Sequence, residues 1–258
     1  MKENKAALIT GASGGLGLEF AKILAEKKYD LVLVARNEGK LNAIKDQFES
    51  KYQIHVSVCP ADLSRVDAAL DVFRFTQERQ IAVDVLVNNA GFGDSGSFAE
   101  CSWQKQYEMV QVNITAVMQL THCFLPGMIE RGHGRILNLS SVAAFCAGPD
   151  MSIYYASKAF VRSFSEAVAE EVRGTGVTVT ALCPGPTATG FEKAADMQSG
   201  SAMFRRAADA VEVAVAGVRA MERGSALCYQ GAFTKLMNVC SRIAPRAVTR
   251  KFAKSMNH

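Results

Sequence analysis

The feature that most constrains the fold of this chain is a regular alternation between short apolar runs and longer segments with helical spacing. Runs such as Leu31–Ala35 and Val85–Val87 are continuously apolar, which is typical of strands covered on both faces. Strands that alternate with helices predict parallel strands joined by right-handed crossovers. The fold class is therefore α/β, a doubly wound parallel β-sheet of about seven strands with helices on both faces.

The boundaries follow from the apolar runs and the helical periods. The expected strands are Ala6–Thr10, Leu31–Ala35, Ile54–Val58, Asp84–Asn88, Arg135–Leu139, Val177–Cys183 and Ala226–Tyr229. The expected helices are roughly Leu16–Lys28, Glu38–Lys51, Val66–Gln80, Trp103–Arg131, Ser152–Gly174, Ala208–Arg223 and a C-terminal segment. In such a fold, ligands bind beyond the carboxyl ends of the strands.

We interpret all 258 residues as one domain, because no linker or repeat divides the chain and its length suits a single large core. No apolar run is expected to span a bilayer, and the charged start Met1–Lys5 leaves no room for a signal peptide. Seven cysteines without a C-x-x-C pair favour reduced thiols over disulfides or a metal site. The four histidines show no ligand spacing. These features predict a cytoplasmic protein without a metal.

A glycine-rich turn links the first expected strand to the first helix. It reads Gly11-Ala-Ser-Gly-Gly-Leu-Gly17. Glycines let the backbone approach a pyrophosphate closely, and the free N–H groups and dipole of the helix N-terminus favour its negative charge. The turn therefore predicts a dinucleotide site, and a merely flexible turn is the alternative.

One tyrosine and one lysine carry the expected chemistry. Tyr154 and Lys158 are about one helical turn apart, so they share a helix face, and Ser141 lies thirteen residues upstream. A nearby cation stabilises a phenolate and lowers a tyrosine pKa that starts near ~10. The pair is thus equipped as a general acid and base for an alcohol or a carbonyl, although such pairs also occur on solvated helix faces.

Together these motifs resemble those of the short-chain dehydrogenase/reductase family in order and spacing. The resemblance rests on Thr10-Gly-x-x-x-Gly15-x-Gly17, Asn88-Asn-Ala-Gly91, Asn113, Ser141, Tyr154-x-x-x-Lys158 and Pro184-Gly185. It runs from about residue 6 to about residue 190, and the glycine spacing favours the compact branch of that family. It implies a Rossmann-like fold and an oxidoreductase that interconverts a carbonyl and a secondary alcohol.

The resemblance also implies the role of each catalytic residue. Tyr154 would transfer the proton, and Ser141 would hydrogen-bond the substrate oxygen. Lys158 would lower the tyrosine pKa and hold the nicotinamide ribose. Asn113 resembles the water-binding asparagine that links this lysine to solvent. No metal is required.

Cofactor contacts are expected around the glycine turn and at the later motifs. Asp62 and Leu63 match the family's adenine contacts, although Asp62 is alternatively an N-cap of the following helix. Thr187 and Thr189 match its carboxamide segment. The full set of expected cofactor-binding residues is Gly11, Ser13, Gly15, Leu16, Gly17, Arg36, Asp62, Leu63, Asn89, Ala90, Gly91, Tyr154, Lys158, Pro184, Gly185, Thr187 and Thr189.

The end of the second expected strand predicts the choice of nicotinamide cofactor. It reads Val34-Ala-Arg36-Asn37, without an acid that would bind the ribose diol. The Arg36 guanidinium suits a phosphate, and Ser13 offers a hydroxyl donor to the same group. We therefore expect NADP(H) rather than NAD(H); the alternative is that Arg36 is only solvated.

Two later segments leave their roles open. Residues 190–206, with Phe191, Met197, Met203 and Phe204, suit either a lid over an apolar substrate or a plain surface loop. Residues 231–258 form a basic amphipathic segment, because all six charged residues from Gly224 onward are basic. It would pack on its own sheet or on a partner subunit, touch a membrane surface, or attract an anionic substrate such as an acyl thioester. Nucleic acid is not expected as a partner.

Alternatives also remain for the function itself. A protein that senses or scaffolds NADP(H) without turnover is the alternative to an enzyme, and a 3-oxoacyl thioester reductase is one version of the enzyme. The family resemblance implies a homodimer or homotetramer built on the two long helices.

Overall fold

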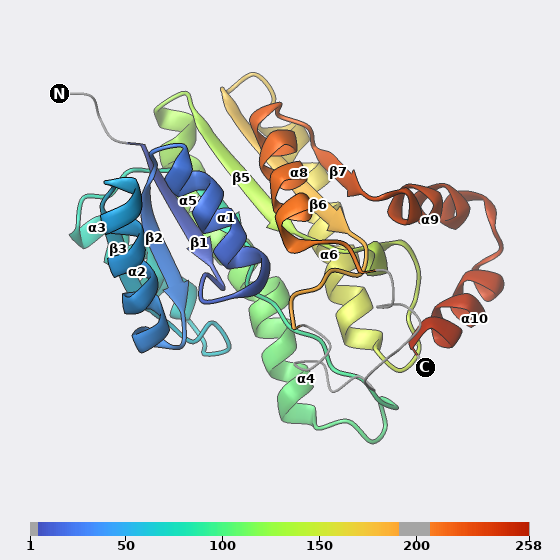
Figure 1. Ribbon diagram of the computed structural model, residues 1–258. Coiled ribbons are helices and arrows are strands. Elements are labelled where there is room, and N and C mark those ends of the chain that lie inside the picture. Colours follow the sequence, from blue (N-terminus) through green and yellow to red (C-terminus); the bar gives the residue numbers. More distant parts are fainter. Residues whose placement is uncertain (1–4, 191–206, 258) are drawn as a thin grey trace.

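The computed structural model describes residues 5–190 and 207–257, and its centre is a seven-stranded parallel sheet (Figure 1). The strand order is β3-β2-β1-β4-β5-β6-β7, so the order reverses between β1 and β4 as in a doubly wound fold. The strands are β1 Ala6–Thr10, β2 Asp30–Ala35, β3 Val56–Pro60, β4 Val83–Asn88, β5 Gly134–Leu139, β6 Val177–Pro184 and β7 Leu227–Gln230. The fold class expected from the sequence is confirmed.

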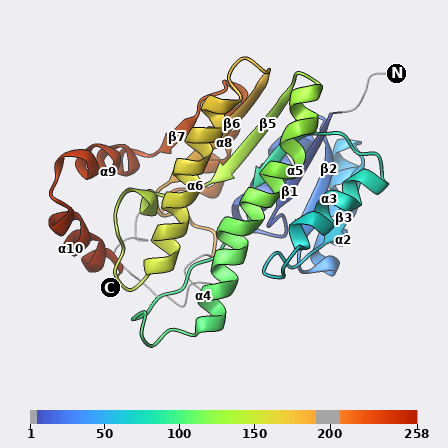
Figure 2. The same ribbon diagram turned by 180° about the vertical axis from the view of Figure 1, so that it is seen from behind.

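Helices cover both faces of this sheet. The helices of the described residues are α1 Gly15–Glu26, α2 Glu38–Tyr52, α3 Ala68–Glu78, α4 Trp103–Val110, the π-helix η1 Gln111–Thr115, α5 Ala116–Glu130, the 3₁₀ helix η2 Val142–Phe145, α6 Ser152–Glu171, α8 Ala210–Glu222, α9 Ala232–Ile243 and α10 Arg246–Asn257. Helices α1, α2 and α8 pack on one face, and α3, α5 and α6 pack on the other, which Figure 2 shows from behind.

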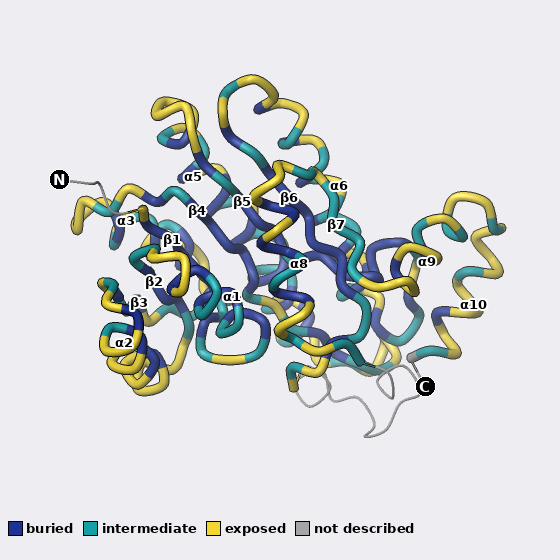
Figure 3. Tube along the Cα trace, turned by 45° about the horizontal axis from the view of Figure 1, so that its top comes forward, coloured by how far each residue is buried: buried dark blue, intermediate teal, exposed yellow. Residues whose placement is uncertain are grey.

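The two core layers explain why the apolar runs become strands. Every residue of β1 is buried, and the central strands form the buried interior in Figure 3. On one side Phe20 of α1 and Phe48 of α2 are fully covered, and on the other Leu120 of α5 is fully covered. Helices reach these positions because their apolar residues recur at helical spacing and so lie on one face.

Several boundaries differ from those expected. The third strand begins at Val56, because α2 continues to Tyr52 and ends at Gln53, whose φ of 52° is left-handed. The next helix begins only at Ala68, after Asp67 with a φ of 63°. The long helix expected from Trp103 is interrupted by the π turn η1. The C-terminal segment forms two helices, which meet around Pro245.

One helical stretch of the described residues, Trp103–Glu130, is long and apolar enough by length and composition to span a membrane. The sequence expectation had excluded any such stretch. In this structure, the α5 part packs its apolar side against β4, β5 and α3, as the core helix of an α/β fold does. Burial within the protein therefore accounts for the apolar residues on the inner side of α5, whereas Met118 and Ile129 are exposed.

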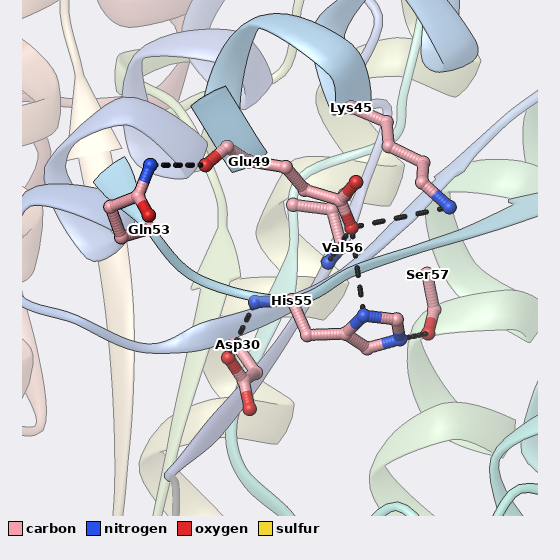
Figure 4. A network of polar contacts seen from close by, with 7 residues as sticks. All are labelled: Asp30, Lys45, Glu49, Gln53, His55, Val56 and Ser57. Carbon is pink, nitrogen blue, oxygen red and sulfur yellow. Dashed lines mark hydrogen bonds and ion pairs between the residues drawn. The ribbon is translucent and has the colours of Figure 1, made fainter. Parts of the chain in front are cut away.

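A polar network holds α2 against the amino ends of β2 and β3, the end of the sheet opposite the strand carboxyl ends (Figure 4). Glu49 accepts from the Val56 backbone N at 2.9 Å and lies 3.5 Å from His55 Nδ1. The His55 backbone N donates to Asp30 Oδ1 at 2.8 Å. His55 is thus a structural, exposed residue, in line with the absence of ligand spacing in the sequence.

Candidate active site

A cavity of about 550 Å³ opens at the carboxyl ends of the strands and gathers most of the expected site residues. Its walls come from the glycine turn, the end of β4, the loop after β5, the first turns of α6 and the segment after β6. The expected residues that line it are Gly11, Ser13, Gly15, Leu16, Asn89, Ala90, Gly91, Ser141, Tyr154, Lys158, Pro184, Gly185, Thr187 and Thr189. Motifs that lie far apart in the sequence therefore meet in one site.

Gly17 packs too closely on the Gly11 carbonyl group and on Asn89 to admit a side chain. A Cβ on Gly17 would overlap the Gly11 carbonyl oxygen and lie 2.6 Å from Asn89 Nδ2. Gly11 itself has a φ of 67°, which side chains rarely adopt. Asn89 Nδ2 donates to the Thr10 carbonyl oxygen at 2.8 Å, so β4 fixes the start of the turn. Gly17 therefore shapes the turn from behind without lining the cavity.

Helix α1 begins at this turn without a side-chain cap. Its N-cap is Gly14, and no acidic residue lies in its first turn. A Cβ on Gly14 would meet no atom within 4 Å, so the space in front of the helix start is open. Uncapped N–H groups and the helix dipole at a cavity wall suit a pyrophosphate. The residues present thus fit the expected dinucleotide.

Tyr154 and Lys158 point into the same cavity from α6. Lys158 Nζ lies 5.8 Å from the centre of the Tyr154 ring and donates to the Leu139 carbonyl oxygen at 2.9 Å. The Ser140 hydroxyl donates to the Lys158 carbonyl oxygen at 2.8 Å, so Ser140 holds α6 against β5. Ser141 Oγ accepts from the Ala143 backbone N at 3.1 Å and hydrogen-bonds to Tyr154.

Burial sets the pKa values of these two groups. Burial raises the pKa of Tyr154 to about 12, against the lowering effect of the Ser141 hydrogen bond. Burial lowers the pKa of Lys158 to about 8, and the Cys183 thiol acts weakly in the other direction. The sequence led us to expect a lowered tyrosine pKa. That expectation is wrong for the protein alone, because desolvation of the phenol outweighs the interactions that favour the phenolate.

Asn113 is buried behind the cavity in the π turn. Its Nδ2 donates to the Phe92 carbonyl oxygen at 2.9 Å and to Ser157 Oγ at 3.1 Å, and its Oδ1 accepts from the Phe92 N at 3.1 Å. A Cβ on Gly91 would lie 3.0 Å from Asn113 Oδ1 and 3.3 Å from Lys158 Nζ. Asn113 therefore ties the loop after β4 to α6 beside the lysine, while its role in binding water stays a prediction.

The expected adenosine contacts lie farther from the cavity. Arg36 is exposed at the end of β2. Asp62 Oδ1 accepts from the backbone N and the hydroxyl of Ser64, at 3.1 and 2.7 Å. Burial raises the pKa of Asp62, but the Ser64 hydrogen bonds and the charges of Arg36 and Arg65 lower it more, so the pKa is lowered overall.

The alternative role of Asp62 as a helix cap is wrong. Asp67 occupies the N-cap position of α3, and Asp62 instead caps the turn that precedes it. Leu63 is buried in the core beneath this turn, with only 7% of its surface exposed. Asp62 therefore keeps its carboxylate partly exposed, and the adenine contact expected of the Leu63 backbone N–H stays a prediction.

Sequence reasoning missed Lys40, which lines the cavity. Asn37 caps α2 by accepting from the Lys40 backbone N at 2.9 Å, so Lys40 lies in the first turn of the helix that follows β2. Helical spacing gave no signal for it, because Arg36 precedes the N-cap Asn37 and so lies outside the helix that carries Lys40. The lid expected at residues 190–206 falls, apart from Gly190, outside the described residues.

Comparison with known proteins agrees with this geometry. A family model described as short chain dehydrogenase matches residues 5–200. The ketoacyl reductase HetN of Nostoc sp. is 32% identical over 255 residues, which cover 95% of this chain and 87% of that protein. A short-chain dehydrogenase from Sphingobium yanoikuyae, solved in complex with NADPH, superimposes with a TM-score of 0.81 at 30% identity and covers 87% of both chains.

A further relative is longer than this chain. The very-long-chain 3-oxoacyl-CoA reductase of Laccaria bicolor is 35% identical over 183 residues, which cover 70% of this chain and 54% of that protein. The chain therefore spans about half the length of this relative.

We predict that Gly17→Ala disrupts the glycine turn whereas Gly14→Ala does not. The new methyl group at position 17 would meet backbone and the Asn89 amide, but at position 14 it would meet open space. Gly17→Ala should lower the melting temperature by several degrees and weaken NADPH binding at least tenfold, as measured by thermal unfolding and fluorescence titration. Equal behaviour of the two variants would contradict this packing.

We also predict that Lys158→Met stabilises the protein at neutral pH. A pKa lowered from 10.5 to about 8 means that the unfolded chain binds more protons between these values, so stability rises with pH across this window. The lowered pKa of Lys158 corresponds to a loss of about 3 kcal/mol in the free energy of unfolding at pH 7, because the charged group is buried. In urea unfolding, the advantage of the Met variant should therefore shrink between pH 7 and 9.5. Parallel pH curves for the variant and wild type would refute it, and the exposed Lys254→Met serves as control.

Proposed function

This chain belongs to the short-chain dehydrogenase family, and we propose that it is an NADP(H)-dependent oxidoreductase that interconverts a carbonyl and a secondary alcohol. The observation that carries the proposal is one cavity lined by the glycine turn, Ser141, Tyr154 and Lys158. The turn offers a place for the pyrophosphate, and the three side chains offer a proton and hydrogen bonds to a substrate oxygen.

The chemistry divides between the cofactor and the chain. Bound NADPH would supply the hydride that reduces the carbonyl carbon. The Tyr154 hydroxyl donates its proton to the carbonyl oxygen, so that an alcohol forms, and Ser141 Oγ hydrogen-bonds that oxygen. After this transfer a phenolate remains on Tyr154, and the positive charge of Lys158 beside it stabilises that phenolate.

The high pKa of Tyr154 is consistent with proton donation. A phenol with a pKa of about 12 stays protonated at neutral pH and is ready to protonate the substrate oxygen. The reverse reaction needs the phenolate, which burial disfavours. The environment of Tyr154 thus suits the proton donation that the reduction step requires.

A preference for NADP(H) rests on two basic residues after β2. Arg36 directly follows the strand, and Lys40 lines the cavity from the first turn of α2. The described residues from Asp30 to Asn37 place no carboxylate at the end of this strand, where it would repel a 2′-phosphate. Two cations at this position suit the extra phosphate of NADP(H). The NADPH complex of the Sphingobium relative supports the same choice.

A 3-oxoacyl thioester is the substrate class favoured within this function. Relatives carry the names ketoacyl reductase and very-long-chain 3-oxoacyl-CoA reductase, at 32% and 35% identity. A homodimer or homotetramer and a cytoplasmic location stay predictions. A protein that binds NADP(H) without turnover remains the competing function, and substrate turnover separates the two.

We predict that Tyr154→Phe abolishes turnover and retains NADPH binding. The variant keeps the ring but loses the proton donor, a loss of about 10²- to 10⁴-fold in kcat for general acid catalysis. Tyr155→Phe is the matched control, because Tyr155 lines the same cavity but is one residue out of register. The measurement is NADPH oxidation with a panel of ketones, aldehydes and 3-oxoacyl thioesters. Substantial activity of Tyr154→Phe would overturn the assignment, and a wild type that binds NADPH but reduces nothing would favour the sensor.

We predict that Arg36→Leu and Lys40→Leu each weaken NADPH binding about tenfold and leave NADH binding unchanged. Each variant removes one charge-assisted contact to the 2′-phosphate, a loss of roughly 1.5 kcal/mol. Lys45→Leu is the control, because Lys45 lies on α2 outside the cavity, near Glu49. Fluorescence titration with both cofactors provides the measurement. Equal catalytic efficiency of the wild type with NADPH and NADH would refute the preference.

A further inference from the structure

A second cavity, of about 790 Å³, adjoins the catalytic one and has a separate set of walls. It lies between α6, the loop around η2 and the two C-terminal helices, which extend from the β7 edge of the sheet (Figure 1). Tyr155 lines both cavities, and its ring centre lies 6.2 Å from that of Tyr154. A ligand in the second cavity would therefore lie next to the reacting group.

The C-terminal helices close this cavity through a few buried contacts. Met237 of α9 packs with Val142 and Phe145. Ala253 of α10 is 1% exposed and packs in the cluster that contains Tyr155. Because α10 returns to the loop around η2, the cavity is bounded on its outer side by α9 and α10 and on its inner side by α6.

The walls of this cavity carry a strong excess of positive charge. We call it the arginine cavity, because Arg162 of α6, Arg242 of α9, and Arg246 and Arg250 of α10 line it, against one carboxylate, Glu166. Within residues 5–190 and 207–257, none of these four guanidinium groups forms an ion pair or donates a hydrogen bond. Four guanidinium groups that line one cavity without a carboxylate partner suit an anionic ligand.

Arg162 marks the inner end of this site. Its guanidinium lies 5.1 Å from the centre of the Phe145 ring, which holds it in place. Its Nε is buried and has no hydrogen-bond partner. A buried charged donor without an acceptor is costly, and an anionic ligand would remove that cost. The three other arginines are exposed at the mouth of the cavity.

Helix geometry gives the distance between this anion site and the reacting group of Tyr154. Arg162 follows Tyr154 by eight residues on α6, which is about 12 Å along the helix axis. A substrate that reaches both must have its carbonyl separated from its anionic group by an extended arm. Several guanidinium groups around one cavity suit more than one phosphate better than a single carboxylate.

We propose that the arginine cavity binds the phosphate groups of coenzyme A and thereby selects 3-oxoacyl-CoA thioesters as substrates. This inference rests on the proposed reductase function and assigns residues to its substrate class. The pantetheine arm would run along α6 past Tyr155, with the 3-oxo group at Tyr154 and the phosphates among the arginines. The sequence showed an excess of positive charge in the C-terminal segment, and the structure places part of that charge beside the active site.

The first experiment compares two thioesters of the same 3-oxoacyl group. One is carried on coenzyme A, and the other on N-acetylcysteamine, which has no phosphate. The variant is Arg246→Gln with Arg250→Gln, two exposed positions where the fold should be retained. The matched control is Lys251→Gln with Lys254→Gln, which removes the same charge from α10 outside the cavity.

We expect the arginine variant to raise the KM for the coenzyme A thioester at least tenfold with little change in kcat. Its KM for the N-acetylcysteamine thioester should stay within twofold, and the lysine control should match the wild type for both. If the arginine variant has the same KM as the wild type for each of the two thioesters, the cavity assignment is wrong while the reductase function stands. If the wild type reduces neither thioester nor any ketone, the reductase function itself fails.

A binding measurement tests the cavity without turnover. Calorimetry with free coenzyme A uses protein saturated with NADPH, so that the nucleotide cannot enter the cofactor site. The wild type and the lysine control should bind coenzyme A, and the arginine variant should lose at least tenfold in affinity. Absence of binding, or binding that the arginine variant retains in full, overturns the proposal. A third outcome also overturns it: the wild type binds anionic phospholipid vesicles, the arginine variant does not, and neither binds coenzyme A. The arginines would then bind lipid headgroups.

Discussion

The site depends on the way that α6 is fastened to the end of β5. Lys158 Nζ donates to the Leu139 carbonyl oxygen at 2.9 Å, and Ser140 Oγ donates to the Lys158 carbonyl oxygen at 2.8 Å. These two bonds fix one turn of the helix on the carboxyl edge of the sheet. Tyr154, one turn earlier, then has to face the cavity. The arrangement has a cost, because Lys158 is a charged residue that is only 4% exposed.

Much of the fold could be predicted because its signals are local. Continuous apolar runs identify strands covered on both faces, and their alternation with helices predicts parallel strands joined by right-handed crossovers. The strand order itself came only from the structure. The glycine turn was predictable for a related reason. Only glycine allows the contact between Gly17 and the Gly11 carbonyl group, so the close packing leaves a visible mark in the sequence. Tyr154 and Lys158 were found because helical spacing places them on one face and because the other motifs match those of a known family in order and spacing.

The rest depends on tertiary contacts that a pattern does not record. The pKa of Tyr154 is set by how far surrounding groups cover it, so the neighbouring lysine alone led to the wrong direction. The π turn around Asn113 has no apolar signature, although it aims the amide at Phe92 and Ser157. Lys40 became visible only when α2 was placed against the cavity. The charge of the C-terminal segment was evident, but not that two helices would enclose a space beside α6.

Helices α9 and α10 are attached to the rest of the protein by few buried side chains. Their described buried residues are Thr234, Met237 and Ala253, and most of their remaining surface is exposed (Figure 3). Substitutions elsewhere on these two helices therefore change little of the free energy of folding. The sheet and its catalytic edge are under a different constraint, since nearly every position there is close-packed. The surface chemistry of the C-terminal pair can accordingly change without disturbing the packing of the sheet beneath it.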